Sequence, residues 1–209
     1  MAGQPGAIQL DEAALEIAAL VQPVDAVAAL RTLDEWAARI ADLLPPASGG
    51  AQFLGAANRV LFSDLGLRGD LTDYYSPVNS CLDQVLLRRK GLPITLSVIY
   101  IEIARRLMRP VYGVGLPAHF VCLYNDGLVR VFIDVFDRGN LLTEADCLDL
   151  VEALTGRRLD PSPLLFSPVS DSQILTRMVN NLCASWRNAG EGEKADHAGL
   201  WLKHARSSR

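Results

Sequence analysis

An apolar segment in the middle of the chain sets the first condition on the fold. Pro93 stands at its start, where proline is best tolerated in a helix, and the residues from Ile94 to Leu107 suit one continuous helix. Apolar side chains go almost all the way round this helix: Ile94, Leu96, Val98, Ile99, Ile101, Ile103, Ala104 and Leu107. A helix that is apolar on every side has to be surrounded by protein. We therefore expect Ile94 to Leu107 to be the central and most buried helix.

The composition suits one sizeable core with an appendage. The chain has 209 residues, of which 50% are hydrophobic and 21% are charged, and this excludes general disorder. The formal net charge is -4, and the densest basic spots, Leu87 to Lys90 and Arg105-Arg106, are typical of solvated helix ends. We therefore predict that nucleic acid is not a partner.

The cysteines are scattered, and none stands in the close pairs typical of metal or redox sites. They are Cys81, Cys122, Cys147 and Cys183. We expect reduced thiols in a cytoplasmic protein with no metal and no cofactor. The longest apolar stretch, Leu92 to Ala104, is too short to cross a bilayer and contains Glu102, and Met1 to Leu10 lacks a secretion pattern. No membrane association is predicted.

Helical periodicity and turn residues predict an α+β fold. The predicted helices besides the central one are Asp11 to Val21, Val24 to Leu44, Gln52 to Leu65, a helix with Asn79 or Ser80 as its N-cap that ends near Gly91, and Glu144 to Thr155. The predicted strands are Val111 to Val114, Phe120 to Tyr124 and Val129 to Asp134. A proline-rich connector, Asp160 to Pro168, leads to a helical hairpin, Ser172 to Arg206, broken at Gly190 to Gly192.

These elements predict one compact unit of three parts. Residues 1–70 form an N-terminal helical lobe. Residues 71–160 form a core in which the buried central helix packs on a small antiparallel sheet, and residues 161–209 form a C-terminal helical extension.

Asp126-Gly127 is a strong hairpin signal between two of these strands. With these two residues as the loop, Tyr124 faces Val129 and, further from the turn, His119 faces Asp134. A four-residue loop from Asn125 to Leu128 gives the same pairing. Directly opposed side chains have Cβ atoms about 4.5 to 5.5 Å apart, so a carboxylate can reach an imidazole. The hairpin is therefore predicted to build a His and Asp pair.

His119 is the histidine with a candidate function, since His197 and His204 are expected on the surface of the C-terminal helices. A histidine oriented by a carboxylate is the base used by cysteine and serine hydrolases. The alternative is a hydrogen-bonded pair that only fixes the hairpin. The residues alone leave both interpretations open.

Ordered short segments between Ala14 and Leu154 carry a resemblance to a known family. They are Asp73-Tyr74-Tyr75, Asn79-Ser80, Arg89 to Ser97, Arg105-Arg106-Leu107, Tyr112 to Gly115, Pro117 to Phe120, Ile133 to Phe136 and Leu141-Leu142. In this order and spacing they resemble the bacterial SirB-type transglutaminase-like family, and the tail resembles that family's tetratricopeptide extension. The resemblance implies a papain-like core preceded by helices, in a superfamily whose active enzymes use Cys, His and Asp.

The resemblance makes His119 the superfamily histidine and Asp134 its aspartate. The superfamily cysteine would stand at the start of the central helix, where the helix dipole lowers the pKa of a thiol. Here that stretch, Pro93 to Ser97, contains no cysteine. Thr95 and Ser97 offer hydroxyls, which depend more than a thiol on an adjacent base.

Cys81 is the alternative nucleophile, because Asn79 and Ser80 place it in the first turn of a helix. The competing and preferred interpretation is a small buried hydrophobic residue. Cys122 alternates with His119 along its strand and is predicted to face away from the pair.

The chain also differs from the residues usual in that family at three places. Ala118 stands where a glycine is common, Val135 replaces a proline after the aspartate, and Met108-Arg109 replace a glycine-containing turn. Ala118 and Val135 flank the candidate pair, so they weaken the expectation of intact catalytic geometry.

Two functions remain open on this basis. The first is a non-catalytic or regulatory module that binds a protein or peptide through a degenerate cleft and its helical tail. The second is a hydrolase or acyl transferase acting on amide bonds through His119 and Asp134 with Thr95, Ser97 or a displaced thiol. The missing cysteine favours the first, and we expect no thiol-dependent amidase or transglutaminase activity.

Overall fold

The computed structural model describes the backbone of residues 9–207 and the side chains of residues 9–200. The helices are α1 (Leu10–Ala19), α2 (Ala26–Ala41), α3 (Gly50–Asn58), α4 (Leu82–Arg88), α5 (Pro93–Arg106), α6 (Glu144–Thr155), α7 (Asp171–Asn188) and α8 (Gly192–Ser207), with a π-helical segment η1 (Arg59–Asp64) and a 3-10 turn η2 (Pro77–Ser80). The strands are β1 (Arg68–Gly69), β2 (Lys90–Gly91), β3 (Val111–Leu116), β4 (His119–Asn125), β5 (Arg130–Asp134) and β6 (Asn140–Leu142). The predicted α+β class is confirmed.

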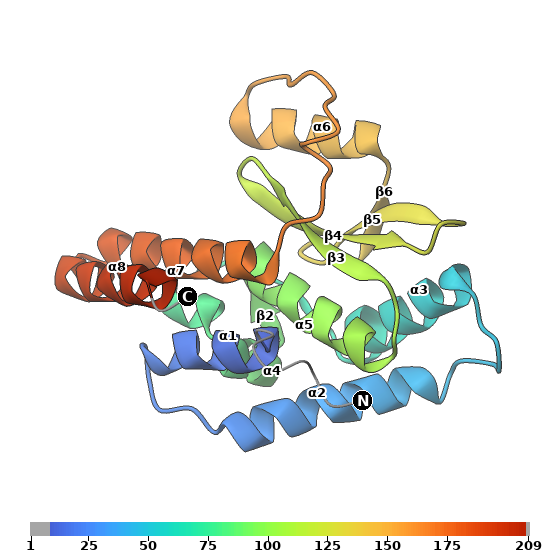
Figure 1. Ribbon diagram of the computed structural model, residues 1–209, viewed down its shortest axis with the longest axis horizontal. Helices are drawn as coiled ribbons and strands as arrows, with labels where there is room; N and C mark the ends of the chain where they lie inside the picture. Colours follow the sequence, from blue (N-terminus) through green and yellow to red (C-terminus); the bar gives the residue numbers. More distant parts are fainter. Residues whose placement is uncertain (1–8, 208–209) are drawn as a thin grey trace.

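Helix α5 lies at the centre, between the larger sheet and a layer of helices (Figure 1). All residues from Pro93 to Ala104 are buried. One side of α5 packs on β3 and β4, and the others contact α1, α2, α4 and α7. The prediction of a central helix that is covered all round is confirmed.

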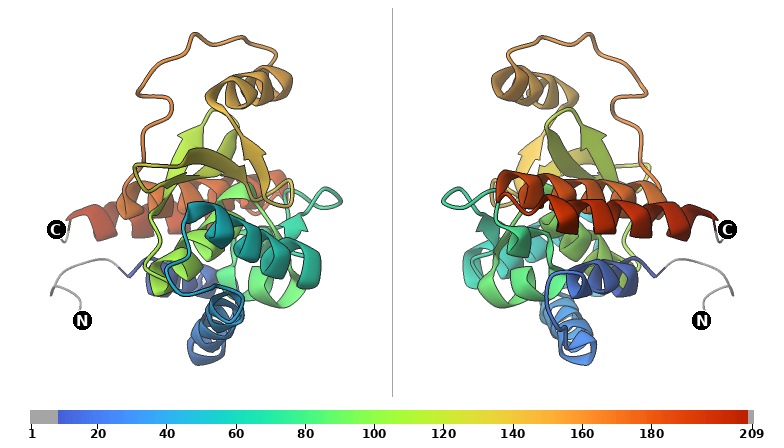
Figure 2. Two further views of the ribbon diagram at one scale, coloured as in Figure 1. Left: turned by 90° about the vertical axis from the view of Figure 1, so that its right-hand side faces the viewer. Right: turned by 90° about the vertical axis from the view of Figure 1, so that its left-hand side faces the viewer.

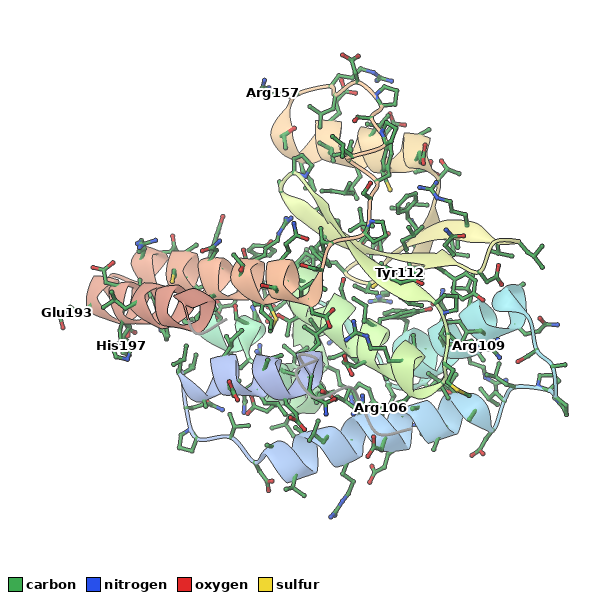
Figure 3. All side chains as sticks on the ribbon, in the orientation of Figure 1. Arg106, Arg109, Tyr112, Arg157, Glu193 and His197 are labelled. Carbon is green, nitrogen blue, oxygen red and sulfur yellow. The ribbon has the colours of Figure 1, made fainter. Side chains whose placement is uncertain are left out.

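Glu102 is the one acidic residue of α5, and it lies in an ion-pair network at the C-terminal end of the helix. Its carboxylate accepts hydrogen bonds from Arg105 at 2.7 Å and from Arg106 at 3.1 Å; Figure 3 labels Arg106. The two guanidinium groups also contact one carboxylate on each of three neighbouring helices: Asp11 of α1, Asp34 of α2 and Asp171 of α7. The polar end of α5 is thereby tied to its surroundings.

The larger sheet is antiparallel, with the strand order β3-β4-β5-β6. Helix α5 covers one face and α6 lies over the other (Figure 1). Alternation along β4 divides its side chains between two cores. Phe120, Cys122 and Tyr124 join the core around α5, whereas Val121 and Leu123 join the smaller core under α6.

The register of the β4–β5 hairpin differs from the predicted one by two residues. Tyr124 pairs with Val131 rather than Val129, so His119 and Asp134 are not directly opposed as predicted. A shift of two residues keeps both side chains on the same face, because side chains alternate with a period of two. The predicted contact between them therefore survives the wrong register.

The physical reason for the shift is the position of the hairpin loop. Asn125 pairs with Arg130, which leaves Asp126 to Val129 as the loop. The Asp126 carboxylate accepts hydrogen bonds from the backbone N–H groups of Leu128 at 2.9 Å and Val129 at 2.7 Å. Asp126 therefore organises a four-residue loop that begins one residue later than the expected four-residue alternative, Asn125 to Leu128.

Three short strands and one helix cap were missed. Strands β1 and β2 form a small parallel sheet, and β6 extends the larger one. The N-cap of α4 is Cys81 rather than Asn79 or Ser80, because Pro77–Ser80 form a 3-10 turn of their own. Strands of two or three residues are too short for an alternating pattern to be recognised.

The predicted C-terminal hairpin is formed by α7 and α8, and the break at Gly190 to Gly192 is confirmed. The two helices lie side by side along one flank of the molecule (Figure 2). His197 is exposed on α8, as expected, and the His204 side chain lies outside the described residues. Among the described helices, none has both the length and the apolar character that a membrane crossing requires.

Two residues that replace an expected glycine have left-handed backbone conformations. Met108, after α5, has φ +53°, and Ala118, in the turn between β3 and β4, has φ +58°. Residues with a Cβ atom adopt this region at a cost of about 1 to 2 kcal/mol. The backbone at both positions is therefore one that suits glycine better than a residue with a Cβ atom.

The central position of α5 predicts a large loss of stability when its buried side chains are shortened. Leu96→Ala or Ile101→Ala is expected to lower the free energy of unfolding by about 2 to 5 kcal/mol, because each leaves a cavity in a helix with protein on all sides. Urea denaturation of the purified variants measures the change. Losses below about 1 kcal/mol at both positions would show that α5 is not central.

The strained turn after α5 predicts a gain of stability. Met108→Gly is expected to raise the free energy of unfolding by about 0.5 to 1 kcal/mol, because the relief of the left-handed conformation exceeds the added freedom of the unfolded chain. Leu87→Gly, inside α4 and also exposed, is the matched control and should lose about 1 kcal/mol. Equal losses in both variants, measured by thermal unfolding, would contradict this explanation.

Candidate functional site

His119 and Asp134 form a buried hydrogen-bonded pair at the end of the larger sheet. The Nε2 atom of His119 lies 3.0 Å from Oδ1 of Asp134, and the two residues are 6% and 4% exposed. The same Oδ1 accepts hydrogen bonds from the backbone N–H groups of Phe136 at 3.0 Å and Asp137 at 3.2 Å. An oxygen that accepts three hydrogen bonds orients the imidazole with Nε2 as the donor, so Nδ1 is the nitrogen left for base chemistry.

A chain of aromatic rings leads from this pair to the surface. The Phe136 ring lies edge-on to His119 with the ring centres 6.0 Å apart, and Tyr74 lies edge-on to Phe136 at 6.0 Å. Tyr75 contacts Tyr74 at 5.3 Å and is 57% exposed. The loop that carries the two tyrosines therefore borders the candidate site.

A polar cluster holds this tyrosine loop in place. The Asp70 carboxylate accepts hydrogen bonds from Thr72 and from Arg88 at 2.8 Å each. Asn79 Nδ2 donates to the carbonyl oxygens of Asp73 at 2.6 Å and Tyr74 at 3.3 Å. Burial raises the pKa of Asp70. The hydrogen bonds that Asp70 accepts from Thr72, from the backbone of Asp73 and from Arg88 outweigh burial and keep that pKa below its ordinary value.

The tyrosine loop is joined to the start of α5 through the small parallel sheet. Gly69 of β1 donates its backbone N–H to the carbonyl oxygen of Phe136 at 3.0 Å, and β1 pairs with β2, which runs into Pro93. A Cβ atom on Gly69 would come within 2.4 Å of the Phe136 ring. Glycine is needed here because the ring beside His119 packs directly on the backbone.

Arg177 of α7 holds the turn that carries His119. Its Nη2 donates to the carbonyl oxygens of Leu116 at 3.0 Å and of His119 at 2.6 Å, on either side of the Pro117-Ala118 turn. Sequence reasoning missed this residue. Arg177 and His119 are 58 positions apart, and no local pattern marks a contact of that separation.

The two hydroxyls at the expected nucleophile position differ in their surroundings. Thr95 is completely buried, and its Oγ1 has no hydrogen-bond partner among the described residues. Ser97 is also buried, but its hydroxyl donates to the carbonyl oxygen of Pro93 at 2.8 Å. No hydrogen bond within residues 9–200 joins either hydroxyl to His119. The start of α5 therefore holds one uncommitted hydroxyl, that of Thr95.

The thiols of Cys81 and Cys122 are both buried and make no hydrogen bond to His119 among the described residues. Cys81 is buried and donates to the carbonyl oxygen of Pro77 at 3.5 Å, and burial raises its pKa to about 12. Cys122 lies on the α5 face of the sheet against the carbonyl oxygen of Ser97, and burial raises its pKa to about 12 as well. Both expected interpretations are confirmed: Cys81 is a small buried residue, and Cys122 faces away from His119.

Both residues of the pair are buried. Four surface pockets in the described part of the chain are all lined by other residues. Over the same residues, no group of three or more His, Cys, Asp or Glu side chains is arranged to hold a metal ion. Besides Asp134, the described residues Phe136 and Arg177 contact His119.

Comparisons with known proteins agree with the fold class. A family model described as the transglutaminase-like superfamily matches residues 27–180. A UPF0162 protein from Xylella fastidiosa is 36% identical over 147 residues, which cover 68% of this chain and 52% of that protein. A UPF0162 protein from Pseudomonas aeruginosa is 34% identical over 189 residues, 87% of this chain and 66% of that protein.

A human protein is also similar. F-box only protein 21 from Homo sapiens is 34% identical over 148 residues, which cover 67% of this chain but 23% of the human protein. No solved structure matches. This chain spans less than two thirds of the human and Xylella relatives, so the matched region is the part that they share. The match to most of its length shows that the chain belongs to the transglutaminase-like superfamily.

Proposed function

We propose that this chain is a non-catalytic or regulatory member of the superfamily that binds a protein or peptide on the surface beside His119. The observation that carries the proposal is that no cysteine stands at the start of α5 and that no thiol among the described residues is hydrogen-bonded to His119. The start of α5, Pro93 to Ser97, has Thr95 but no cysteine. The thiol of Cys122, on the same strand as His119, lies on the α5 face of the sheet. A papain-type reaction needs the nucleophile within hydrogen-bond reach of its base.

The exposed apolar side chains beside the pair support a binding role. Leu71 is 83% exposed, Tyr75 is 57% exposed and Tyr74 is 36% exposed. Rigidly held tyrosines lose little conformational freedom when they contact a partner, and they are common in binding hot spots. The hydrogen bonds of Asp70 and Asn79 supply this rigidity.

Further parts of the proposal rest on the sequence. They are a kinship with the SirB-type branch, a tetratricopeptide-like tail, a cytoplasmic location and the three-part division at residues 70 and 160. The F-box name of the human relative is compatible with a role in protein interaction. Nucleic acid is not among the proposed partners.

One observation favours an alternative function. The Thr95 hydroxyl is buried at the start of α5 and makes no hydrogen bond within the described residues. A buried hydroxyl without a partner costs about 1 to 3 kcal/mol, so its retention is compatible with a role in acyl transfer or amide hydrolysis with His119 as base. Ser97 is the weaker candidate because its hydroxyl is committed to Pro93.

The proposal predicts that the purified protein does not turn over amide or ester substrates. A broad panel of both classes is incubated with and without iodoacetamide, and product is measured by mass spectrometry. No turnover above buffer is expected, because the buried Cys81 and Cys122 thiols stay protonated at neutral pH.

Three variants identify the group responsible if turnover is found. Loss of activity on alkylation and in Cys81→Ala would make Cys81 the nucleophile and contradict the binding role. Activity that resists alkylation but is lost in both His119→Ala and Thr95→Val would establish the alternative. Thr95→Val keeps the shape of the side chain, so its stability is expected to be unchanged or higher.

The binding role predicts that peptides selected from a random displayed library contact the tyrosine loop. Tyr75→Ala is expected to weaken the selected peptides by about tenfold, because a tyrosine at the centre of an interface contributes several times more than its neighbours. Leu128→Ala, at a side chain that is 95% exposed in the β4–β5 loop, is the control and should leave affinity unchanged. Failure to enrich any peptide, or equal effects of the two substitutions, would count against the proposed surface.

A further inference from the structure

We propose that Arg177, together with the Tyr74 phenol, forms a subsite for a carboxylate group of the bound peptide. This inference rests on the proposed function and deepens it by naming the chemistry of the partner. The carboxylate belongs to a chain terminus or to an acidic side chain of an extended peptide that lies across the tyrosine loop.

The guanidinium of Arg177 has N–H groups that make no hydrogen bond among the described residues. An arginine side chain carries five N–H groups. Both hydrogen bonds of Arg177 within the described residues, to Leu116 and to His119, are made by Nη2. Nε and Nη1 have no hydrogen-bond acceptor there, and neither is among the fully buried unpartnered atoms, so both reach solvent. Nε and Nη1 lie on different edges of the guanidinium, so each is a single charged donor that can give one charge-assisted hydrogen bond to a carboxylate.

The positive charge of Arg177 has no carboxylate partner within residues 9–200. None of the ion pairs described for these residues includes it, although the side chain is half-buried and lies over the Phe120 ring at 5.4 Å. Burial lowers the pKa of Arg177, and the Tyr74 phenol opposes that effect. A half-buried cation is costly without a counter-ion, so an anion that binds to the free protein gains the compensation that is absent.

The surroundings select a carboxylate on a peptide rather than a free anion. Nη1 lies over the bare backbone of Gly115, where a Cβ atom would come within 3.0 Å of it. Tyr74 contacts the Phe136 ring, which lies against His119, the residue whose carbonyl oxygen Arg177 binds, and Tyr75 extends the apolar surface outward. A partner with an apolar side chain next to its carboxylate engages both the rings and the guanidinium.

Arg109 provides a matched control. It is half-buried, lies over the Phe53 ring at 5.7 Å and has no carboxylate partner among the described residues, like Arg177. Its Nε, however, is fully buried, and its terminal nitrogens donate to Ser48. Arg109 precedes β3 and Arg177 holds the far end of that strand, so the two arginines test different places; Figure 3 labels Arg109 beside α3.

The experiment compares three short peptides by NMR titration of the full chain. The peptides are N-acetyl-alanyl-phenylalanyl-alanine as the free acid, the same peptide as its amide, and the amide of N-acetyl-alanyl-phenylalanyl-glutamate. Sodium acetate is the free-anion control. The signals followed are the backbone N–H groups of His119 and Phe120 and the Nε–H of Arg177.

Both acids are expected to bind about tenfold more tightly than the amide, because a charge-assisted hydrogen bond is added. Arg177→Gln should abolish that difference, and Arg109→Gln should keep it. Tyr74→Phe, which removes only the hydroxyl, should weaken the acids by about threefold. Since Arg177→Gln also loosens the His119 turn, the wild-type titration is repeated at high salt, where the acids but not the amide should weaken.

The outcomes separate the two proposals. If the amide binds as tightly as the acids, or if Arg177→Gln keeps the difference, the carboxylate subsite is wrong while the binding surface stands. Equal shifts by acetate and by the acids would mean an adventitious anion site and overturn the inference. If none of the peptides shifts His119, the subsite is wrong, and the catalytic panel then decides the proposed function independently.

Discussion

The rest of the structure depends on the need to cover α5 on every side. Its twelve buried residues, Pro93 to Ala104, require a sheet above and helices below and beside them. This demand explains why the chain devotes α1, α2, α4 and α7 to one helix, and why the sheet faces it with Phe120 and Tyr124. The ion-pair network of Glu102 closes the polar end of the same helix. The superfamily resemblance predicts the nucleophile at the start of α5. The uncommitted side chain found there is the hydroxyl of Thr95.

Much of this arrangement could be predicted from the sequence, because hydrophobic periodicity depends on burial. The apolar circumference of α5 predicted its central position, and alternation along β4 predicted that His119 and Cys122 lie on opposite faces. The pair of His119 and Asp134 was predicted correctly from a register that was wrong by two residues. A register shift of two residues leaves each side chain on the same face of the sheet, because side chains alternate with a period of two. The position of the loop could not be predicted, since it depends on the hydrogen bonds of Asp126.

The parts that could not be predicted depend on contacts between distant segments. Arg177 reaches His119 from 58 residues away, and Gly69 accommodates Phe136 from a strand of two residues. Neither contact leaves a periodic pattern in the chain. The uncommitted hydroxyl of Thr95 was likewise invisible, since its lack of a partner is a property of the packed interior. The positive φ angles at Met108 and Ala118 show that both residues stand where the backbone suits glycine, which the sequence alone did not reveal.

The hydrogen bonds of Arg177 have a consequence for where this protein can be divided. Helix α7 follows the proline-rich connector and would be lost together with α8 if the chain were cut at the predicted boundary of residue 160. Without α7, the carbonyl groups of Leu116 and His119 lose the guanidinium that donates to both of them. The turn that contains the left-handed Ala118 then lacks this support. The minimal folding unit that preserves the His119 site therefore runs past residue 160 and includes at least the first two turns of α7, so the C-terminal helices are part of the site's architecture rather than an attachment to it.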